Sequence, residues 1–300
     1  MTINWTGVFP ALVTPFSRDG QLDKSKLAHL VDLVVSEGVS GIVVGGSTGE
    51  YYSMTVPERL ELFAAVKDLV PENCVLIAGT SSINHAETIE LTDEAKQIGY
   101  DGCMVLPPVY SLPTPNEILK AFEEVASVGL PVMVYNNPAR AGVGLNPALV
   151  QKLAQMENIV AYKESSRDLY VISEIFHTTR DHVSLFAGLE PYGSALLSRG
   201  AVGIVSTISN VCAREVVAYY QAYKNNDQAT LSQMQQIIDE IYHLIPRVGM
   251  SNYAFVKSAM TALGRPSGVP RRPHYLADDA LIEKIGKEIR DIYSRAGVAR

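Results

Sequence analysis

Eight short apolar runs, separated by segments with helical periodicity, constrain the fold of this 300-residue chain more than any other feature. The runs are rich in Val and Ile and are mostly continuous rather than alternating, which is typical of parallel strands buried on both faces. We expect strands within residues 7–14, 41–46, 74–79, 102–108, 131–137, 159–165, 183–188 and 202–207.

The segments between these runs carry apolar residues at helical spacing. One of them has Pro57 near its start, where proline is tolerated in a helix, and another ends at Gly38, a residue suited to a helix C-terminus. We expect helices within residues 23–38, 56–70, 84–99, 114–129, 146–156 and 167–179.

A strand followed by a helix, repeated eight times, has two main solutions: a closed (β/α)8 TIM barrel or an open doubly wound sheet. The runs begin 19–34 residues apart with no long antiparallel interruption, which favours the barrel. After residue 225 only helical patterns follow. We therefore predict a catalytic barrel over residues 1–225 and a C-terminal helical extension over residues 226–300.

Composition excludes several classes of protein. The net charge is −7 and no segment is densely basic, so we expect no nucleic-acid partner. No apolar run reaches the ~18 residues needed to span a bilayer, and the first residues lack the basic region of a signal peptide. The three cysteines, Cys74, Cys103 and Cys212, are widely spaced, which indicates buried thiols in a reducing compartment. We expect a cytoplasmic protein without a membrane partner.

In a barrel, side chains at the carboxyl ends of the strands face the active site. Lys163 is unusual among them because it ends the apolar run Ile159–Tyr162. Partial desolvation would lower the pKa of its amine, and a neutral amine can attack a carbonyl group to form a Schiff base. The alternative is a surface lysine at a strand end.

Two further candidates follow the preceding strand. The phenol of Tyr135 could relay protons as a general acid and base, or the ring could simply fill the barrel interior. The guanidinium of Arg140 could bind a carboxylate, or it could lie on the surface.

The segment Gly45–Glu50, GGSTGE, permits several interpretations. Its Gly-x-Ser-x-Gly spacing fits the nucleophile elbow of a serine hydrolase, but no helix pattern begins until about Pro57, which places Ser47 in a longer loop. No lysine follows in the position that a phosphate-binding loop requires, and the GxGxxG spacing of dinucleotide sites is absent. A carboxylate clamp and a simple tight turn both remain open for this segment. The six histidines show no ligand spacing, so we expect no metal site.

With GGSTGE, YNNPAR and AYKES placed after three of the strands, the chain resembles the Schiff-base lyases that include dihydrodipicolinate synthase and N-acetylneuraminate lyase. FPALVTPF near the start and PPVY at 107–110 also match, and the resemblance covers essentially the whole chain. It implies a homotetramer built as a dimer of dimers, a pyruvate-like 2-oxo acid as substrate, a second small substrate, and no metal or organic cofactor.

The resemblance also implies roles for individual residues. Lys163 matches the lysine that forms the imine, and Tyr135 matches the tyrosine that shuttles protons at that centre. Ser47 and Thr48 match the hydroxyl pair that holds the 2-oxo acid carboxylate. Tyr110 matches a tyrosine that reaches across a dimer contact to complete a relay. The remaining matches are substrate-binding positions: Arg140, which binds a carboxylate of the second substrate, and Gly188, Val205 and Glu190 at the pocket.

The chain departs from both named enzymes in the second-substrate half of the site. Gly188-Leu189-Glu190-Pro191 replaces the Gly-Asp-Asp of the synthase and the Gly-x-Asp-Glu of the lyase, while Arg140 favours an acidic second substrate. A synthase-like aldol reaction is expected. The alternatives are a 2-keto-3-deoxy sugar acid aldolase or dehydratase, a related catabolic deaminase, and a non-catalytic sensor of 2-oxo acids.

Overall fold

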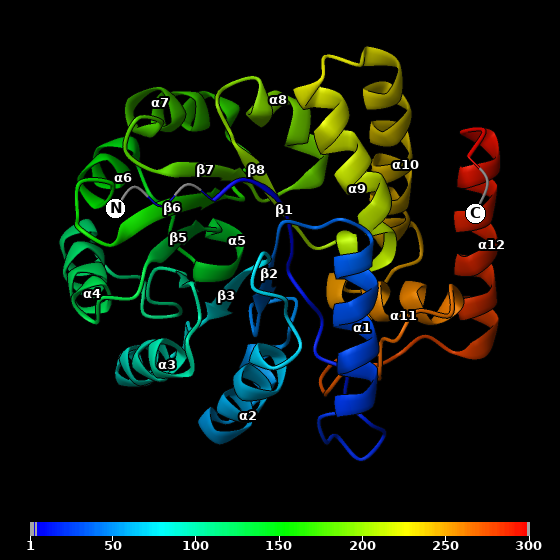
Figure 1. Ribbon diagram of the computed structural model, residues 1–300, viewed down its shortest axis with the longest axis horizontal. Helices are drawn as coiled ribbons and strands as arrows, with labels where there is room; N and C mark the ends of the chain where they lie inside the picture. The colour runs from blue at the N-terminus through cyan, green and yellow to red at the C-terminus, as the bar shows by residue number, and fades with distance from the viewer. Residues whose placement is uncertain (1–2, 4, 299–300) are drawn as a thin grey trace.

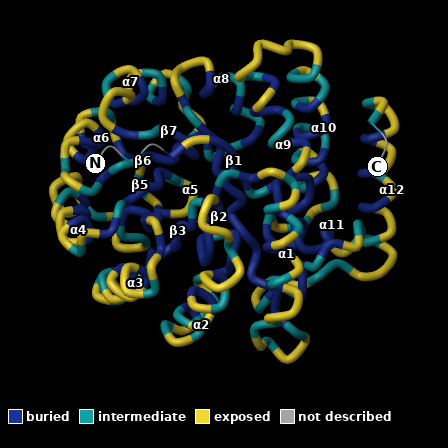
Figure 2. Tube along the Cα trace, in the orientation of Figure 1, coloured by how far each residue is buried: buried dark blue, intermediate teal, exposed yellow. Residues whose placement is uncertain are grey.

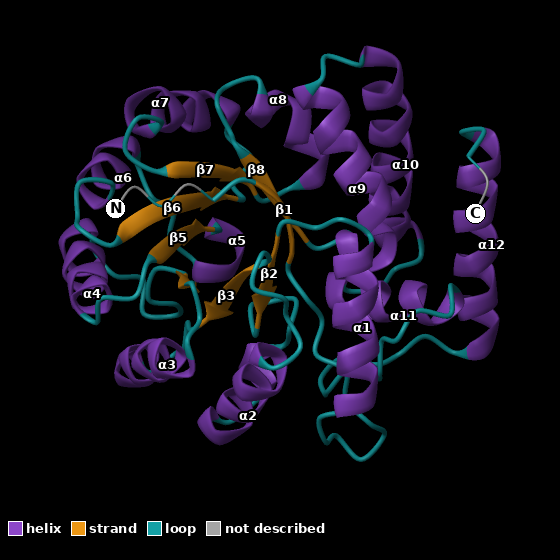
Figure 3. Ribbon diagram, in the orientation of Figure 1, coloured by secondary structure: helices purple, strands orange, loops and turns teal. Residues whose placement is uncertain are grey.

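Eight parallel strands form the centre of the protein in a computed structural model that describes residues 3 and 5–298 (Figures 1 and 3). Their order is β1-β8-β7-β6-β5-β4-β3-β2. A bridge between Ala11 and Val43 joins the two ends of the sheet, and the Leu12 N–H donates to the Val43 carbonyl at 2.9 Å. The protein is therefore a (β/α)8 TIM barrel, as predicted, and not an open sheet.

The strands are shorter than the apolar runs that predicted them, because residues at one or both ends of each run belong to the adjoining loops. They are β1 (Gly7–Pro10), β2 (Gly41–Val44), β3 (Val75–Gly79), β4 (Gly102–Val105), β5 (Val132–Asn136), β6 (Ile159–Glu164), β7 (Ser184–Ala187) and β8 (Gly203–Ser206).

The helices surround the strands, and their caps explain where they begin. Thr55 accepts a hydrogen bond from the Glu58 N–H and Glu58 reaches back to Thr55, a reciprocal capping box with Pro57 in the first turn. The helices of the barrel are α1 (Lys24–Ser36), α2 (Val56–Lys67), α3 (His85–Ile98), α4 (Pro115–Ser127), α5 (Pro138–Ala141), α6 (Pro147–Leu153), α7 (Leu169–Thr179), α8 (Gly193–Leu197) and α9 (Ser209–Lys224). The short helices α5 and α8, and the 3-10 turns Tyr51–Ser53 and Glu190–Tyr192, carry too few residues for a periodic signal and were not predicted.

Two apolar clusters divide the core. The inner cluster fills the barrel with one side chain or more from each strand, including Phe9 and Phe186, whose ring centroids lie 5.2 Å apart. The outer cluster lies between the strands and the helices. Figure 2 shows the result: the strands are buried at nearly every position, whereas the helices are exposed on their outer faces. The barrel is therefore a packed core, and a ligand site is confined to its ends.

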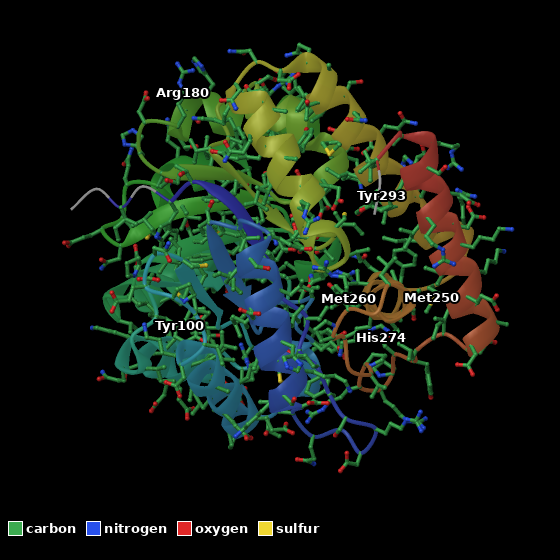
Figure 4. The ribbon with its side chains drawn as sticks, turned by 45° about the vertical axis from the view of Figure 1, so that its right-hand side comes forward. Tyr100, Arg180, Met250, Met260, His274 and Tyr293 are labelled. Carbon is green, nitrogen blue, oxygen red and sulfur yellow. The ribbon has the colours of Figure 1, made fainter. Side chains whose placement is uncertain are left out.

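Three helices follow the barrel, as predicted: α10 (Gln228–Arg247), α11 (Asn252–Ala262) and α12 (Asp279–Arg295). In Figure 4, Met260 of α11 and Tyr293 of α12 are labelled on neighbouring parts of this bundle, and both side chains are buried. α11 packs on α9 and α12, so the extension is continuous with the barrel core. The boundary at residue 225 stays a prediction.

The cysteines and the lengths of the helices bear on two further expectations. All three cysteines are buried, as predicted. Among the helices in the described part of the chain, none combines the length and apolar character needed to cross a membrane.

Candidate functional site

A cavity of about 260 Å³ opens at the carboxyl ends of the strands. The loops after β2, β5, β6, β7 and β8 line it, together with residues of α10 and α11. The residues predicted for the site that reach this cavity are Ser47, Thr48, Tyr135, Arg140, Lys163, Gly188 and Glu190.

Lys163 lies near the end of β6, opposite Tyr135 of β5 in the strand register. Its side chain points into the cavity, only 4% exposed, and the Nζ atom is 4.0 Å from the centroid of the Tyr135 ring. Burial lowers the pKa of Lys163 from 10.5 to about 7, and the negative charge of Glu190 opposes this shift. A substantial fraction of the amine is therefore neutral, and nucleophilic, near pH 7.

The Tyr135 phenol is buried above the same amine. Its oxygen accepts a hydrogen bond from Asn137 Nδ2 at 2.7 Å, which leaves the phenol proton available to another acceptor. Burial raises the pKa of Tyr135, while hydrogen bonding from Asn137 and Ser165 partly opposes the rise. The phenol therefore keeps its proton at neutral pH and can donate it.

The GGSTGE segment turns sharply after β2. Gly45 has a φ of 66°, and a Cβ atom there would lie 2.9 Å from the Phe63 ring, so only glycine fits without a shift. Thr48 shares a 3.0 Å hydrogen bond with Thr207 after β8, and both hydroxyls face the cavity with that of Ser47. A 3-10 turn follows and α2 begins only at Val56. Ser47 is thus not on a strand-to-helix elbow, and none of the described residues lining the cavity is a histidine.

Glu50 ends the same segment in the left-handed conformation, with φ 61°, and is completely buried. Its Oε1 lies 2.5 Å from Nζ of Lys257 on α11, and both side chains are 0% exposed. Lys257 also donates to the carbonyls of Thr14 and Val269, and Glu50 Oε2 accepts from the Arg271 N–H at 2.8 Å. This buried ion pair fixes α11 against the GGSTGE loop.

Glu164, the residue after Lys163, does not line the cavity. Glu164 points away from the cavity, where both of its oxygens accept hydrogen bonds from Asn136 Nδ2 at 3.1 Å and one accepts from the Tyr162 hydroxyl at 2.7 Å. Asn136 in turn accepts from the Leu145 N–H at 3.1 Å. This network ties β6 to the loop after β5, which carries Arg140.

Glu190 occupies the other side of the cavity. Its Oε1 accepts hydrogen bonds from the Ser206 hydroxyl at 2.9 Å and from the Ile208 N–H at 2.8 Å, and the side chain is 3% exposed. Its charge acts on the Lys163 amine, but none of the described lysines or arginines forms a salt bridge with it. A buried carboxylate held in this way can accept hydrogen bonds from a polar ligand.

Two arginines stand at the mouth. Arg140, after β5, places its guanidinium over the Tyr253 ring at 5.0 Å, and Arg167, after β6, lines the same cavity. Both lower the pKa of Tyr242 of α10, which burial raises to about 12. Within the described part of the chain, neither arginine has a carboxylate partner.

Comparisons with known proteins agree with this geometry. The model of the dihydrodipicolinate synthetase family matches residues 4–292. The chain belongs to this family. The resemblance inferred from its motifs is confirmed.

Within the dihydrodipicolinate synthetase family, the chain is 46% identical to an uncharacterized DapA-like lyase of Rhizobium meliloti, over 96% of both chains. It is 34% identical to 4-hydroxy-tetrahydrodipicolinate synthase of Methanoculleus marisnigri, over 94% of this chain and 97% of that one. Among solved structures, it superposes on YagE of E. coli K12, crystallised with pyruvate, with a TM-score of 0.91 and 29% identity, over 96% of this chain and 98% of that one. Members of the family therefore include both a named synthase and a lyase without an assigned substrate.

Two residues that the family resemblance singled out lie outside the cavity. Val205 of β8 is completely buried in the inner apolar cluster. Tyr110, after β4, is 87% exposed, with a φ of 71°, and is not among the residues that line the cavity. The part that each plays stays a prediction.

Sequence reasoning missed the cavity residues of α10 and α11. Tyr242, Asn252 and Tyr253 lie more than 30 residues beyond the last strand, in segments whose helical pattern indicated only packing. Tyr253 is 7% exposed, and Asn252 has a buried Oδ1 atom without a hydrogen-bond partner. Their place in the site depends on how α11 docks, which no local pattern specifies.

Gly188 permits the close packing behind Lys163. A Cβ atom at this position would lie 2.1 Å from Ser165 Oγ, 2.7 Å from the Glu164 carbonyl oxygen and 2.9 Å from Lys163 Cε. We expect Gly188→Ala to displace the lysine and to destabilise the fold by about 1–3 kcal/mol, the usual cost of overpacking. Thermal unfolding and the rate of adduct formation at Lys163 measure the two effects.

The matched variant Gly188→Ala with Ser165→Ala removes the closest of these contacts and leaves those with the Glu164 carbonyl and with Lys163 Cε. It should recover part of the stability. A single Gly188→Ala protein with unchanged melting temperature and adduct rate would contradict the assignment of Gly188 as a residue required for this packing.

Proposed function

We propose that this protein is a Schiff-base lyase that acts on pyruvate or a substituted 2-oxo acid through Lys163, in an aldol reaction like that of dihydrodipicolinate synthase. The observation that carries the proposal is the amine of Lys163, buried in the cavity with a pKa of about 7 and adjacent to the Tyr135 phenol. Membership of a family with named synthases supports the reaction type.

Each residue has a part in the proposed reaction. The hydroxyls of Ser47 and Thr48 bind the carboxylate and orient the keto carbon toward Lys163, which supplies proximity. The neutral amine adds to that carbon, and Tyr135 protonates the departing hydroxyl so that water leaves and an iminium forms. The iminium accepts the electron pair of a C–H or C–C bond at the adjacent carbon, which gives an enamine that can add to an aldehyde.

The second substrate is proposed to be acidic. Arg140 and Arg167 both border the mouth without carboxylate partners, and an arginine can bind a carboxylate through two parallel hydrogen bonds. Gly188 and Glu190 line the same cavity as the two arginines and the amine. The position of Val205 below them is consistent with a supporting part in the pocket floor.

A second candidate is a 2-keto-3-deoxy sugar acid aldolase or dehydratase, or a related catabolic deaminase. Glu190 favours it, because a buried carboxylate outside any salt bridge suits a hydroxyl-bearing substrate better than a second carboxylate. YagE, a relative of this chain, was crystallised with pyruvate, the simplest of the 2-oxo acids that either candidate reaction would involve.

The assembly is proposed to be a homotetramer located in the cytoplasm, without nucleic acid, membrane, metal or organic cofactor. Tyr110 and Leu112 support a subunit contact, since both are large side chains that are 87% and 62% exposed in the single chain. The mass of the protein in solution tests the oligomeric state.

The pH dependence follows from Lys163. Its folded-state pKa is lowered to about 7, so the reactive neutral amine is lost as pH falls through that value. We expect the rate of imine formation at low pyruvate to fall about tenfold per pH unit below pH 7 and to level off above it. The charge of Glu190 opposes the lowering of this pKa, so Glu190→Gln should move the midpoint of the pH–rate curve to lower pH. A midpoint near that of an ordinary lysine would contradict the assignment.

A turnover screen tests the function directly. Pyruvate is paired with acidic and neutral aldehydes, and pyruvate release is followed from sialate and from 2-keto-3-deoxy sugar acids. Consumption or release of a 2-oxo acid, abolished in Lys163→Met, supports the proposal. Thermal stabilisation by pyruvate without turnover in any arm would favour the sensor, and labelling of Ser47 by a fluorophosphonate would favour a hydrolase.

A further inference from the structure

A second cavity, which we call the outer cavity, has a volume of about 520 Å³ and lies where the C-terminal extension packs on the barrel. Helices α1, α9, α11 and α12, which are neighbours at the right of Figure 1, all contribute to its lining. Its charged lining residues are Glu37, Arg214, Glu215, Arg265 and Arg290. None of the described residues that line it also lines the cavity that holds Lys163, so the two cavities are separate.

Glu215 of α9 is the unusual residue of the outer cavity. It is only 6% exposed, and its Oε2 atom is buried without a hydrogen-bond partner. In the described part of the chain, no lysine, arginine or histidine forms a salt bridge with it. α9 breaks at Cys212, whose backbone is not helical, so Glu215 lies in the first turn of the segment that follows, where the helix dipole favours a negative charge. A buried carboxylate without a donor costs free energy, and a ligand that supplies a donor would remove this cost.

Two arginines line the same cavity without an acidic partner. Arg214 follows the break in α9 and Arg290 lies on α12, and both are exposed. Neither forms a salt bridge with a carboxylate of the described residues, Glu215 included. Opposite charges that border one cavity without pairing are complementary to a ligand that carries both charges.

The third arginine, Arg265, already has its partners. Its Nη1 and Nη2 atoms donate to the two carboxylate oxygens of Glu37 at 2.8 and 2.7 Å, and its Nε donates to the Asn210 carbonyl at 2.8 Å. The side chains of Arg265 and Glu37 are 7% and 6% exposed. This pair joins the end of α1 to the turn after α11, so one wall of the outer cavity is fixed before any ligand binds.

The rest of the lining includes apolar side chains. Leu33 of α1, Ala262 of α11 and Leu263, the next residue, are half-buried and border the outer cavity. A hydrocarbon group that covered them would be stabilised by removing apolar surface from water. The outer cavity therefore combines a carboxylate, two free guanidinium groups and an apolar wall.

Other classes of small ligand match this combination less well. A phosphate or a dicarboxylate would meet the negative charge of Glu215, and a polyamine would meet the positive charges of Arg214 and Arg290. Over residues 3 and 5–298, no group of three or more His, Cys, Asp or Glu side chains is placed to hold a metal ion. An ammonium group and a carboxylate on one small molecule satisfy both signs of charge.

We propose that the outer cavity is a second ligand site, which binds a free amino acid with an aliphatic side chain. Glu215 accepts hydrogen bonds from the α-ammonium group, Arg214 and Arg290 bind the α-carboxylate, and the apolar wall contacts the side chain. The site is separate from Lys163 and does not depend on the proposed Schiff-base function.

Calorimetric titration of the full-length protein with L-leucine tests the site. One molecule per chain should bind, with a Kd below about 1 mM. 4-Methylpentanoate lacks the ammonium group and 3-methylbutylamine lacks the carboxylate, so each should bind at least about tenfold more weakly through the loss of hydrogen bonds between charged groups. L-Aspartate and L-lysine should also bind more weakly, because their charged side chains would lie against the apolar wall.

Two substitutions locate the ligand. Glu215→Gln and Arg290→Gln should each weaken L-leucine binding by about 10- to 100-fold, the effect of losing a hydrogen bond between charged groups. Without ligand, Glu215→Gln should melt at or above the temperature of wild type, because it removes an unpaired buried charge. Arg290 is exposed, so its substitution should leave the melting temperature unchanged and gives an independent measurement if the Glu215 variant misfolds.

The matched control is Arg180→Gln. Arg180 is an exposed arginine at the end of α7, and Figure 4 shows it well separated from Met260 and Tyr293 of the C-terminal helices. This variant should bind L-leucine as wild type does. Binding that is weakened in both outer-cavity variants and kept in Arg180→Gln supports the site, whether or not a pyruvyl adduct forms at Lys163.

Three results would overturn the inference. The first is the absence of saturable binding of L-leucine, L-valine and L-alanine to the wild-type protein. The second is unchanged L-leucine binding in Glu215→Gln and Arg290→Gln, which would place the ligand elsewhere. The third is tighter binding of inorganic phosphate or putrescine than of L-leucine, which would assign the outer cavity to a ligand of a single charge.

Discussion

Replacing Lys163 by methionine is expected to abolish turnover of every 2-oxo acid substrate, with a loss of at least about 10⁴-fold, the scale seen when a catalytic nucleophile is removed. The side chain has similar length, so the cavity should keep its shape. The variant should melt at or above the temperature of wild type, because an amine that burial disfavours is replaced by an apolar group. Steady-state turnover and thermal unfolding measure the two effects.

A matched control is Lys152→Met on α6, an exposed lysine that is not among the residues lining the cavity. It should leave turnover unchanged. Residual activity of Lys163→Met within tenfold of wild type would show that another group carries the chemistry.

Replacing Lys257 by methionine is expected to lower the free energy of unfolding by about 3–5 kcal/mol, the cost of leaving a buried charge without its partner. Both members of the Lys257–Glu50 pair are 0% exposed, and the loss of Lys257 would leave a carboxylate oxygen in the core. Urea unfolding, with the extrapolated free energy compared between variants, gives the measurement.

Two controls separate the buried pair from charge effects in general. Combining Lys257→Met with Glu50→Gln removes the uncompensated charge and should recover part of the stability. Lys24→Met breaks the exposed pair with Glu61, whose side chains are 62% and 50% exposed, and should cost at most about 1 kcal/mol. A loss below about 1 kcal/mol for Lys257→Met would contradict its assigned part in docking α11.

The sequence predicted the barrel because the pattern of a buried strand followed by a helix recurs along the chain. Eight Val- and Ile-rich runs with helices between them leave few topologies, and the strand ends then locate Lys163, Tyr135 and Ser47 without any contact information. The late start of the next helix also argued against a nucleophile elbow at Ser47, and the structure agrees, because α2 begins only at Val56.

The remainder of the site depends on long-range docking. Glu50 in the sequence is one acidic residue in a loop, and Lys257 is one lysine in a helix; only the folded chain shows them buried together, which brings Tyr253 to the cavity. The same limitation applies to Arg167, which has the local sequence of a surface arginine and yet borders the cavity. Local sequence patterns locate the side chains at the end of each strand. Contacts between residues about 200 positions apart are set by tertiary packing.

One measurement tests the central claim most directly: incubation of the protein with pyruvate and sodium borohydride, followed by mass analysis of the intact chain and of its peptides. The account predicts the added mass of one reduced pyruvyl group per chain, located on the peptide that contains Lys163, and no adduct when pyruvate or borohydride is omitted. No adduct with pyruvate or any other small 2-oxo acid, or an adduct on a different lysine, would contradict it.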